Sequence, residues 1–69
     1  MHNLSEATIH AEIDLARAPK SHKAVYRTSL QNCVANDVKS GMINKEEAAL
    51  YLQSRCCYGP KGKAILKAC

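Results

Sequence analysis

The feature that most constrains the fold is the stretch from Val38 to Ala49, which combines a helix-ending glycine with a helix-starting cap. Gly41 can take the left-handed backbone conformation that closes a helix, because it has no Cβ to clash. Asn44 is a favoured N-cap, and Glu47 stands three residues later, where its side chain can reach back to the Asn44 amide. This pattern predicts two helices joined by a tight turn.

Other helix boundaries are marked by the same kinds of residue. Ser5 or Asn3 can cap a first helix, and Pro19 ends it because proline disfavours helical backbone in the residue before it. Ser21 can cap a second helix, and Gly59-Pro60 ends a third. No segment shows the period-two alternation of a strand. The expected helices cover about residues 5–18, 21–40, 45–58 and 63–68.

The sequence therefore predicts an all-α fold, a small bundle of three helices plus a short C-terminal helix, as a single domain over residues 1–69. A domain this small has a marginal core, and this one contains no Trp or Phe. Contact with a partner, or with a second copy in a homodimer, would bury further apolar surface. We therefore expect a binding protein.

The first helix has apolar residues on two sides. Ile9 and Ile13, together with Ala16, share one side at helical spacing, and we expect that side to enter the core. The nearly opposite side is predicted to bind a partner, and it carries Leu4, Ala11, Leu15 and Ala18. The alternative is that Leu4 precedes the helix and the alanines are neutral, which leaves only Leu15 exposed.

The net charge of +4 is unevenly distributed along the chain. Residues 1–18 carry three acids against one Arg, whereas residues 19–45 carry five bases against one acid. Such asymmetry can reflect attraction to nucleic acid, although solvated helix faces also produce it. The residues predicted to contact phosphates in that case are Lys20, Lys23, Arg27, Lys61, Lys63 and Lys67.

The cysteines do not follow the spacing of a metal site. Structural zinc sites use paired ligands such as Cys-x-x-Cys, whereas Cys56 and Cys57 are adjacent and point about 100° apart on a helix. We expect Cys33 and Cys56 to fill the core as small hydrophobic residues, and Cys57 and Cys69 to be exposed thiols. No metal and no cofactor is predicted.

Motifs of enzymes are absent from the sequence. There is no glycine-rich nucleotide loop and no metalloprotease or calcium-binding pattern. His10 and Asp14 can pair on a helix face, but no nucleophile accompanies them, so no catalytic residue is assigned. No apolar leader or membrane-spanning stretch is present, which predicts a cytoplasmic protein that does not enter a membrane.

One segment has a family resemblance. Residues 40–47, Ser-Gly-Met-Ile-Asn-Lys-Glu-Glu, are similar to the helical hairpin of short SHOCT-type domains, in which a Ser-Gly turn, an Ile, a capping residue and paired acids recur. The likeness covers under a third of the chain, and the following helix lacks the aromatic residue that usually comes after the acids. It implies a helical hairpin and no function.

Together these features favour a small non-enzymatic protein, a bacterial or phage-type regulator or inhibitor that docks on a larger protein. The alternative is a basic regulator that binds nucleic acid through phosphate contacts. A DNA-reading helix-turn-helix is disfavoured, because Glu46 and Glu47 would stand at the base-facing end of the second helix of that motif and repel phosphate.

Overall fold

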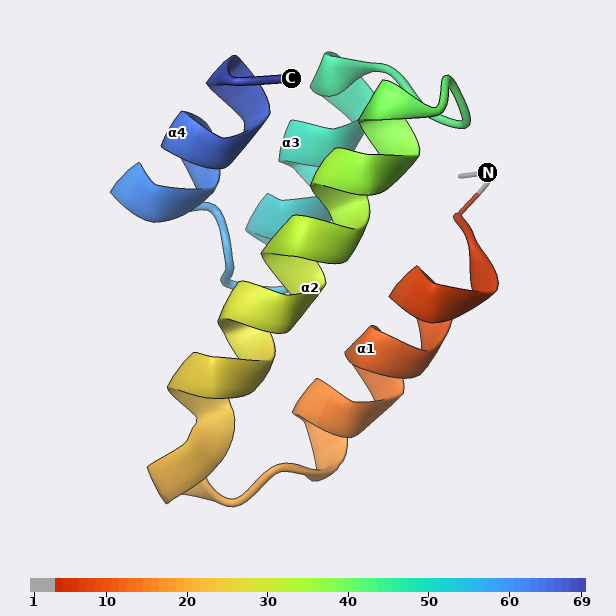
Figure 1. The fold of residues 1–69 in the computed structure, drawn as a ribbon. Helices are drawn as coiled ribbons and strands as arrows, with labels where there is room; N and C mark the ends of the chain where they lie inside the picture. The colour runs from red at the N-terminus through yellow and green to blue at the C-terminus, as the bar shows by residue number, and fades with distance from the viewer. Residues whose placement is uncertain (1–3) are drawn as a thin grey trace.

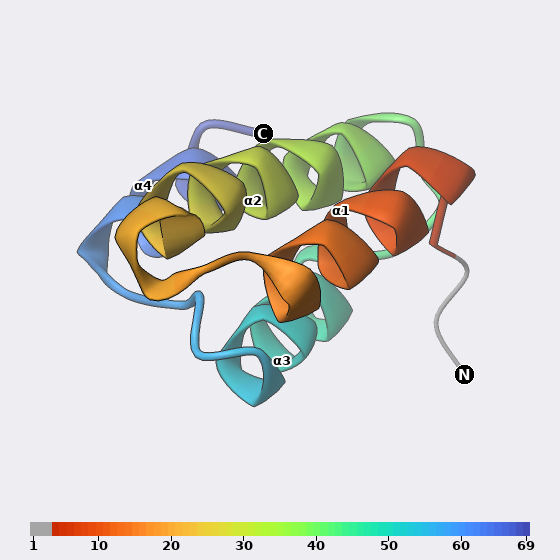
Figure 2. The same cartoon turned by 90° about the horizontal axis from the view of Figure 1, so that it is seen from below.

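The computed structural model describes residues 4–69 as a bundle of helices without strands, which confirms the all-α prediction. The helices are α1 (Glu6–Arg17), α2 (Lys23–Lys39), α3 (Lys45–Ser54) and α4 (Pro60–Lys67), and the short 3₁₀ helix η1 (Lys20–His22) precedes α2. The longest helix, α2, packs against each of the other three (Figure 1). Seen from below, α1 and α4 lie on either side of α2, and α3 lies across from it (Figure 2).

The turn between α2 and α3 has the predicted geometry. Gly41 has a φ of +82°, in the left-handed region that favours glycine. Its amide donates to Val38 O at 3.1 Å, and the Met42 amide donates to Asp37 O at 2.9 Å. These two bonds form a Schellman motif, which satisfies carbonyls at the end of α2.

Two predicted helix caps are also confirmed. The Asn44 side chain accepts from the Glu47 amide at 2.7 Å, and the Glu47 carboxylate accepts from the Asn44 amide at 3.4 Å, which together make a capping box. At the start of α1, Ser5 Oγ accepts from the Thr8 amide at 3.3 Å. Ser5 is therefore the cap, and the alternative, Asn3, lies outside the described residues.

The predicted end of α3 near residue 58 is wrong, because the helix stops at Ser54. Cys56 has a φ of +58° and occupies the left-handed position that a glycine would usually take. Its amide donates to Gln53 O at 3.1 Å, and the Cys57 amide donates to Leu52 O at 2.8 Å. The chain thus leaves α3 through a second Schellman motif, which the sequence pattern did not indicate.

This early ending exchanges the environments of the paired cysteines. Cys56 is exposed and Cys57 is buried, the reverse of the prediction made for a continuous helix. Burial raises the pKa of the Cys57 thiol, which lowers its reactivity. Cys33 is half-buried and packs against the core, and Cys69 is half-buried rather than exposed.

Two helix starts also differ from their predictions. Ser21 does not cap α2: it lies inside η1, and its hydroxyl is 3.1 Å from the neighbouring imidazole. Helix α4 begins at Pro60, whose missing amide is tolerated in a first turn. Gly62, which lies just before the predicted helix over residues 63–68, is instead buried within α4, and a Cβ there would come 2.7 Å from Cys57 O.

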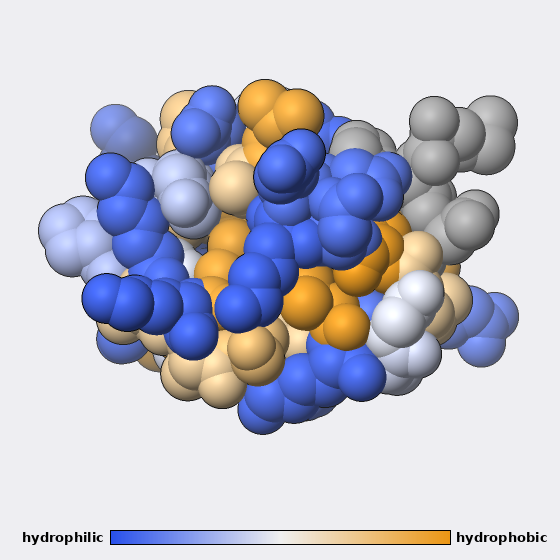
Figure 3. Space-filling model, turned by 90° about the horizontal axis from the view of Figure 1, so that it is seen from above, coloured by the Kyte–Doolittle hydropathy of each residue, from blue (hydrophilic) through white to orange (hydrophobic). Residues whose placement is uncertain are grey.

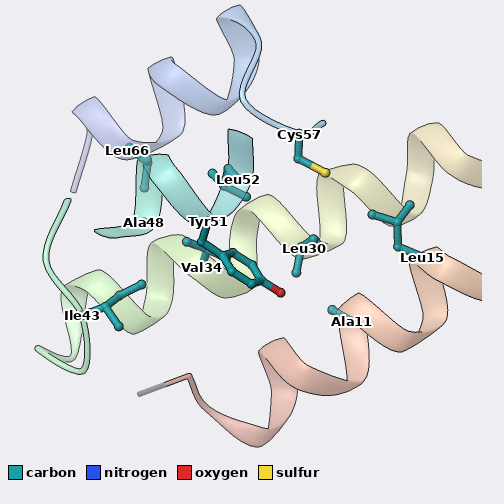
Figure 4. Close-up of a cluster of buried hydrophobic side chains, with 10 residues drawn as sticks. All are labelled: Ala11, Leu15, Leu30, Val34, Ile43, Ala48, Tyr51, Leu52, Cys57 and Leu66. Atoms are coloured by element: carbon teal, nitrogen blue, oxygen red, sulfur yellow. The ribbon is translucent and has the colours of Figure 1, made fainter. Parts of the chain in front are cut away.

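The core lies where α2 meets the other three helices (Figure 4). The largest fully buried side chains include Leu30 and Val34 of α2 and Leu52 of α3. The Tyr51 ring extends from α3 toward α1 and connects two helices whose backbones do not pack directly. The buried cluster comprises Ala11, Leu15, Leu30, Val34, Ile43, Ala48, Tyr51, Leu52, Cys57 and Leu66.

Candidate functional site

The side of α1 that faces the core is the one opposite to the side predicted from the sequence. Ala11 and Leu15 are only 7% and 8% exposed and belong to the core, whereas Ile9 and Ile13 are each 44% exposed. The other two predicted partner-binding residues are half-buried: Leu4 packs against the core, and Ala18 follows the end of the helix. The free apolar side of α1 is therefore the isoleucine side.

A buried polar contact accounts for this orientation. Asp37 of α2 is 3% exposed, and its carboxylate accepts from the Thr8 hydroxyl at 2.7 Å and from the Ser5 amide at 3.1 Å. A buried carboxylate without such donors would be strongly destabilising. Thr8 must therefore face α2, and Ala11 and Leu15, one and two turns further along the same side, follow it into the core.

A second cluster joins α1 to the end of α3. The Tyr51 hydroxyl donates to Glu12 Oε2 at 2.6 Å, and Arg55 Nη2 lies 2.5 Å from Glu12 Oε1. The Arg55 guanidinium also lies 5.3 Å from the centre of the Tyr51 ring. Burial and the Glu12 carboxylate raise the pKa of the Tyr51 phenol. Because Glu12, Tyr51 and Arg55 bind one another and join α1 to the end of α3, we interpret the cluster as a structural tie.

Two of the basic residues predicted to contact phosphates donate hydrogen bonds to other parts of the fold. Lys23 Nζ donates to Leu15 O at 3.2 Å and so binds the C-terminal end of α1. Lys61 Nζ donates to Thr28 Oγ1 of α2 at 3.4 Å. Lys20 and Arg27 are exposed, on η1 and on the first half of α2. Lys20 and Arg27 thus remain exposed to solvent, whereas Lys23 and Lys61 are engaged in hydrogen bonds within the fold.

The last two predicted residues, Lys63 and Lys67, border a surface hollow between α4 and the start of α3. The hollow has a volume of about 360 Å³. Lys63 Nζ lies 5.7 Å from the centre of the Tyr58 ring. The predicted site residues did not include the other three residues that line the hollow, Lys45, Tyr58 and Leu66. Lys63 and Lys67 lie one helical turn apart on α4, and the packing of α3 on α4 adds Lys45 to the same hollow. The lining residues are Lys45, Tyr58, Lys63, Leu66 and Lys67.

Residues 4–69 include neither a cluster of metal-ligating side chains nor a membrane-spanning helix. Among residues 4–69, no three His, Cys, Asp or Glu side chains gather as a metal site would require. Within the same residues, no helix is both long and apolar enough to cross a bilayer. His10 and Asp14 are exposed on α1, and His2 lies outside the described residues.

Comparison with known proteins does not add a functional assignment. No family model matches the chain, and neither a curated protein nor a solved structure matches it. The evidence on function is therefore the surface itself: the isoleucine side of α1 and the lysine-lined hollow between α3 and α4.

Proposed function

We propose that this chain is a non-enzymatic binding protein, a regulator of bacterial or phage type, which docks on a protein partner through the isoleucine side of α1. The observation that carries the proposal is the pair Ile9 and Ile13, one helical turn apart and each 44% exposed. Two branched apolar side chains at this spacing form a ridge of the kind that a hydrophobic groove accepts. The opposite side of the helix is already occupied by the core.

The charge around this side indicates what the partner surface is like. Glu6 and Asp14 are exposed acids on α1, and Arg17 is the single base of that helix. Glu12 is already paired with Arg55. A groove that is apolar in its centre and basic at its rim would complement this helix, because opposite charges at the rim favour the correct orientation.

The test compares two sets of apolar-to-acidic substitutions. The double variant Ile9→Glu/Ile13→Glu should weaken binding to the purified partner, first captured from nuclease-treated lysate, by at least about tenfold. Leu50→Glu is the matched control, because Leu50 is also exposed and apolar but lies on α3. Titration calorimetry measures the affinities, and thermal melting shows that each variant is folded.

Either of two results would contradict the proposal. One is an unchanged affinity of the double isoleucine variant, and the other is an equal loss in Leu50→Glu. Light scattering must accompany the titrations, since a second copy of the chain could occupy the same side of α1. Loss of a dimer in the double variant would replace the protein-partner proposal with self-association.

The second candidate function is nucleic-acid binding by a basic regulator. It is favoured by the net charge of +4 and by the exposure of Lys20 and Arg27 near the start of α2. Phosphate contacts of this kind make affinity fall steeply as salt rises. The variant Lys20→Glu/Arg27→Glu should then abolish binding to duplex DNA or RNA, and equal binding by the variant and the unmodified chain would exclude this candidate.

A further inference from the structure

The hollow between α3 and α4 brings together three lysines from two helices. Lys45 comes from the first turn of α3, and Lys63 and Lys67 lie one turn apart on α4. The start of α3 and the end of α4 meet at the same end of the bundle (Figure 1). Viewed from above, that end shows hydrophobic surface in its middle with hydrophilic side chains around it (Figure 3).

The charge of the hollow is not balanced by acids in its lining. None of its lining residues is acidic, and within residues 4–69 the ion pair between side chains joins Arg55 and Glu12, at another site. Glu46 follows Lys45 directly and is exposed, and the Glu47 carboxylate accepts from the Asn44 amide in the α3 capping box; neither residue lines the hollow. Three lysines that line one hollow concentrate positive charge there, and a multiply charged anion would complement this charge.

The remaining lining residues are apolar or aromatic. Leu66 is 5% exposed and contributes to the core as well as to the hollow, and the Tyr58 ring is half-buried. The volume of about 360 Å³ lies in the lower part of the range of roughly 300–1,000 Å³ found for small-molecule sites. A ligand that fits must combine several negative charges with a compact apolar or planar body.

We propose that this hollow binds a compact organic polyphosphate of the nucleoside triphosphate class, with its phosphates on Lys45, Lys63 and Lys67 and its planar body against Tyr58 and Leu66. A long nucleic-acid backbone is a poorer match, since it requires a continuous basic track. Lys61, the nearest further lysine on α4, turns away to Thr28. The site is separate from the isoleucine side of α1, so the proposal does not depend on the protein-partner function.

The test uses ATP as the probe, with titration calorimetry and NMR spectra of the intact chain. Addition of ATP should shift the Tyr58 ring and Leu66 methyl signals. The variant Lys63→Gln/Lys67→Gln should weaken ATP binding at least about tenfold, and Lys45→Gln should weaken it several-fold. Lys61→Gln is the matched control on the same helix and should change the affinity less than about twofold. These four lysines are exposed, so folding should be unaffected, which thermal melting verifies.

Three results would overturn the proposal. The first is the absence of ATP binding at millimolar concentration. The second is an equal loss of affinity in Lys61→Gln, which would indicate general charge attraction. The third is tripolyphosphate binding as tightly as ATP, since a bare polyanion would then suffice and the planar body would not be recognised. Loss of binding in the double variant, together with weaker binding of tripolyphosphate, would support it.

Discussion

The substitution Thr8→Val tests the contact that sets the orientation of α1. It replaces the hydroxyl with a methyl group of similar size, so the packing volume is nearly conserved. The Asp37 carboxylate, 3% exposed, loses its 2.7 Å hydrogen bond and keeps only the 3.1 Å bond from the Ser5 amide. Hydrogen bonds to charged groups contribute about 1.5–3 kcal/mol, so we expect the free energy of unfolding to fall by that amount.

This change is large for a domain of this size. One kcal/mol shifts the melting temperature of a 60–100-residue domain by roughly 4–8 °C, so Thr8→Val should lower it by roughly 6–24 °C. Urea unfolding followed by circular dichroism measures the free energy directly. The slope of the free energy against urea should stay unchanged, because the substitution does not alter the surface exposed on unfolding.

Two controls separate the hydrogen bond from the packing. Thr8→Ser keeps the hydroxyl and removes the methyl, so it should cost less than Thr8→Val. In an Asp37→Ala background, Thr8→Val should lower the free energy of unfolding by less than it does in the unmodified chain, because the carboxylate acceptor is gone and only the 3.1 Å contact of the Thr8 hydroxyl with Ser5 Oγ remains. If Thr8→Val in the unmodified chain were as stable as the parent, Asp37 would not explain why α1 buries Ala11 and Leu15.

Three further predictions concern the turns and the buried tyrosine. Cys56→Gly should raise the free energy of unfolding by about 1 kcal/mol, and Gly41→Val should lower it by at least about as much. The reason is that both positions have positive φ, which glycine adopts more easily than other residues. Urea midpoints equal to that of the unmodified chain would contradict this. Gly62→Ala should lower the free energy of unfolding by about 1–3 kcal/mol, although Ala has the better helix propensity, because its Cβ would lie 2.7 Å from Cys57 O. A rise in melting temperature would show instead that α4 can move to make room for the Cβ. The raised pKa of Tyr51 means that the folded state favours the neutral phenol. The unmodified chain should therefore exceed Tyr51→Phe in free energy of unfolding by its full amount below about pH 10, and by less at higher pH. A difference in free energy between the two chains that does not depend on pH would refute this.

The candidate binding residues show which parts of a site can be predicted from the sequence and which cannot. Lys63 and Lys67 were predicted to contact phosphates because they belong to a lysine-rich C-terminal segment. Lys45 is 18 residues before Lys63, and the hollow that contains both exists only because α3 and α4 pack together. The sequence identified the side of α1 with Ile9 and Ile13 as apolar, but it predicted that this side is buried, whereas it is exposed.

The sequence by itself determined the features that depend on neighbouring residues. Gly41, Asn44 and Glu47 specify the turn between α2 and α3, because each acts on backbone groups within five residues of it. Ser5 begins α1 and Pro19 follows its end for the same local reason. These signals were sufficient for the all-α fold.

Tertiary structure alone decided which side of α1 faces the core and where α3 ends. The two sides of α1 are similarly apolar, and the choice rests on the bond from Thr8 to Asp37, 29 residues away. The left-handed backbone of Cys56 is locally unfavourable for a residue with a Cβ, but it turns Cys57 into the core, where Gln31 of α2 donates to its carbonyl at 2.6 Å. Contacts between distant residues outweigh local preference at both places, and spacing along one helix cannot reveal them.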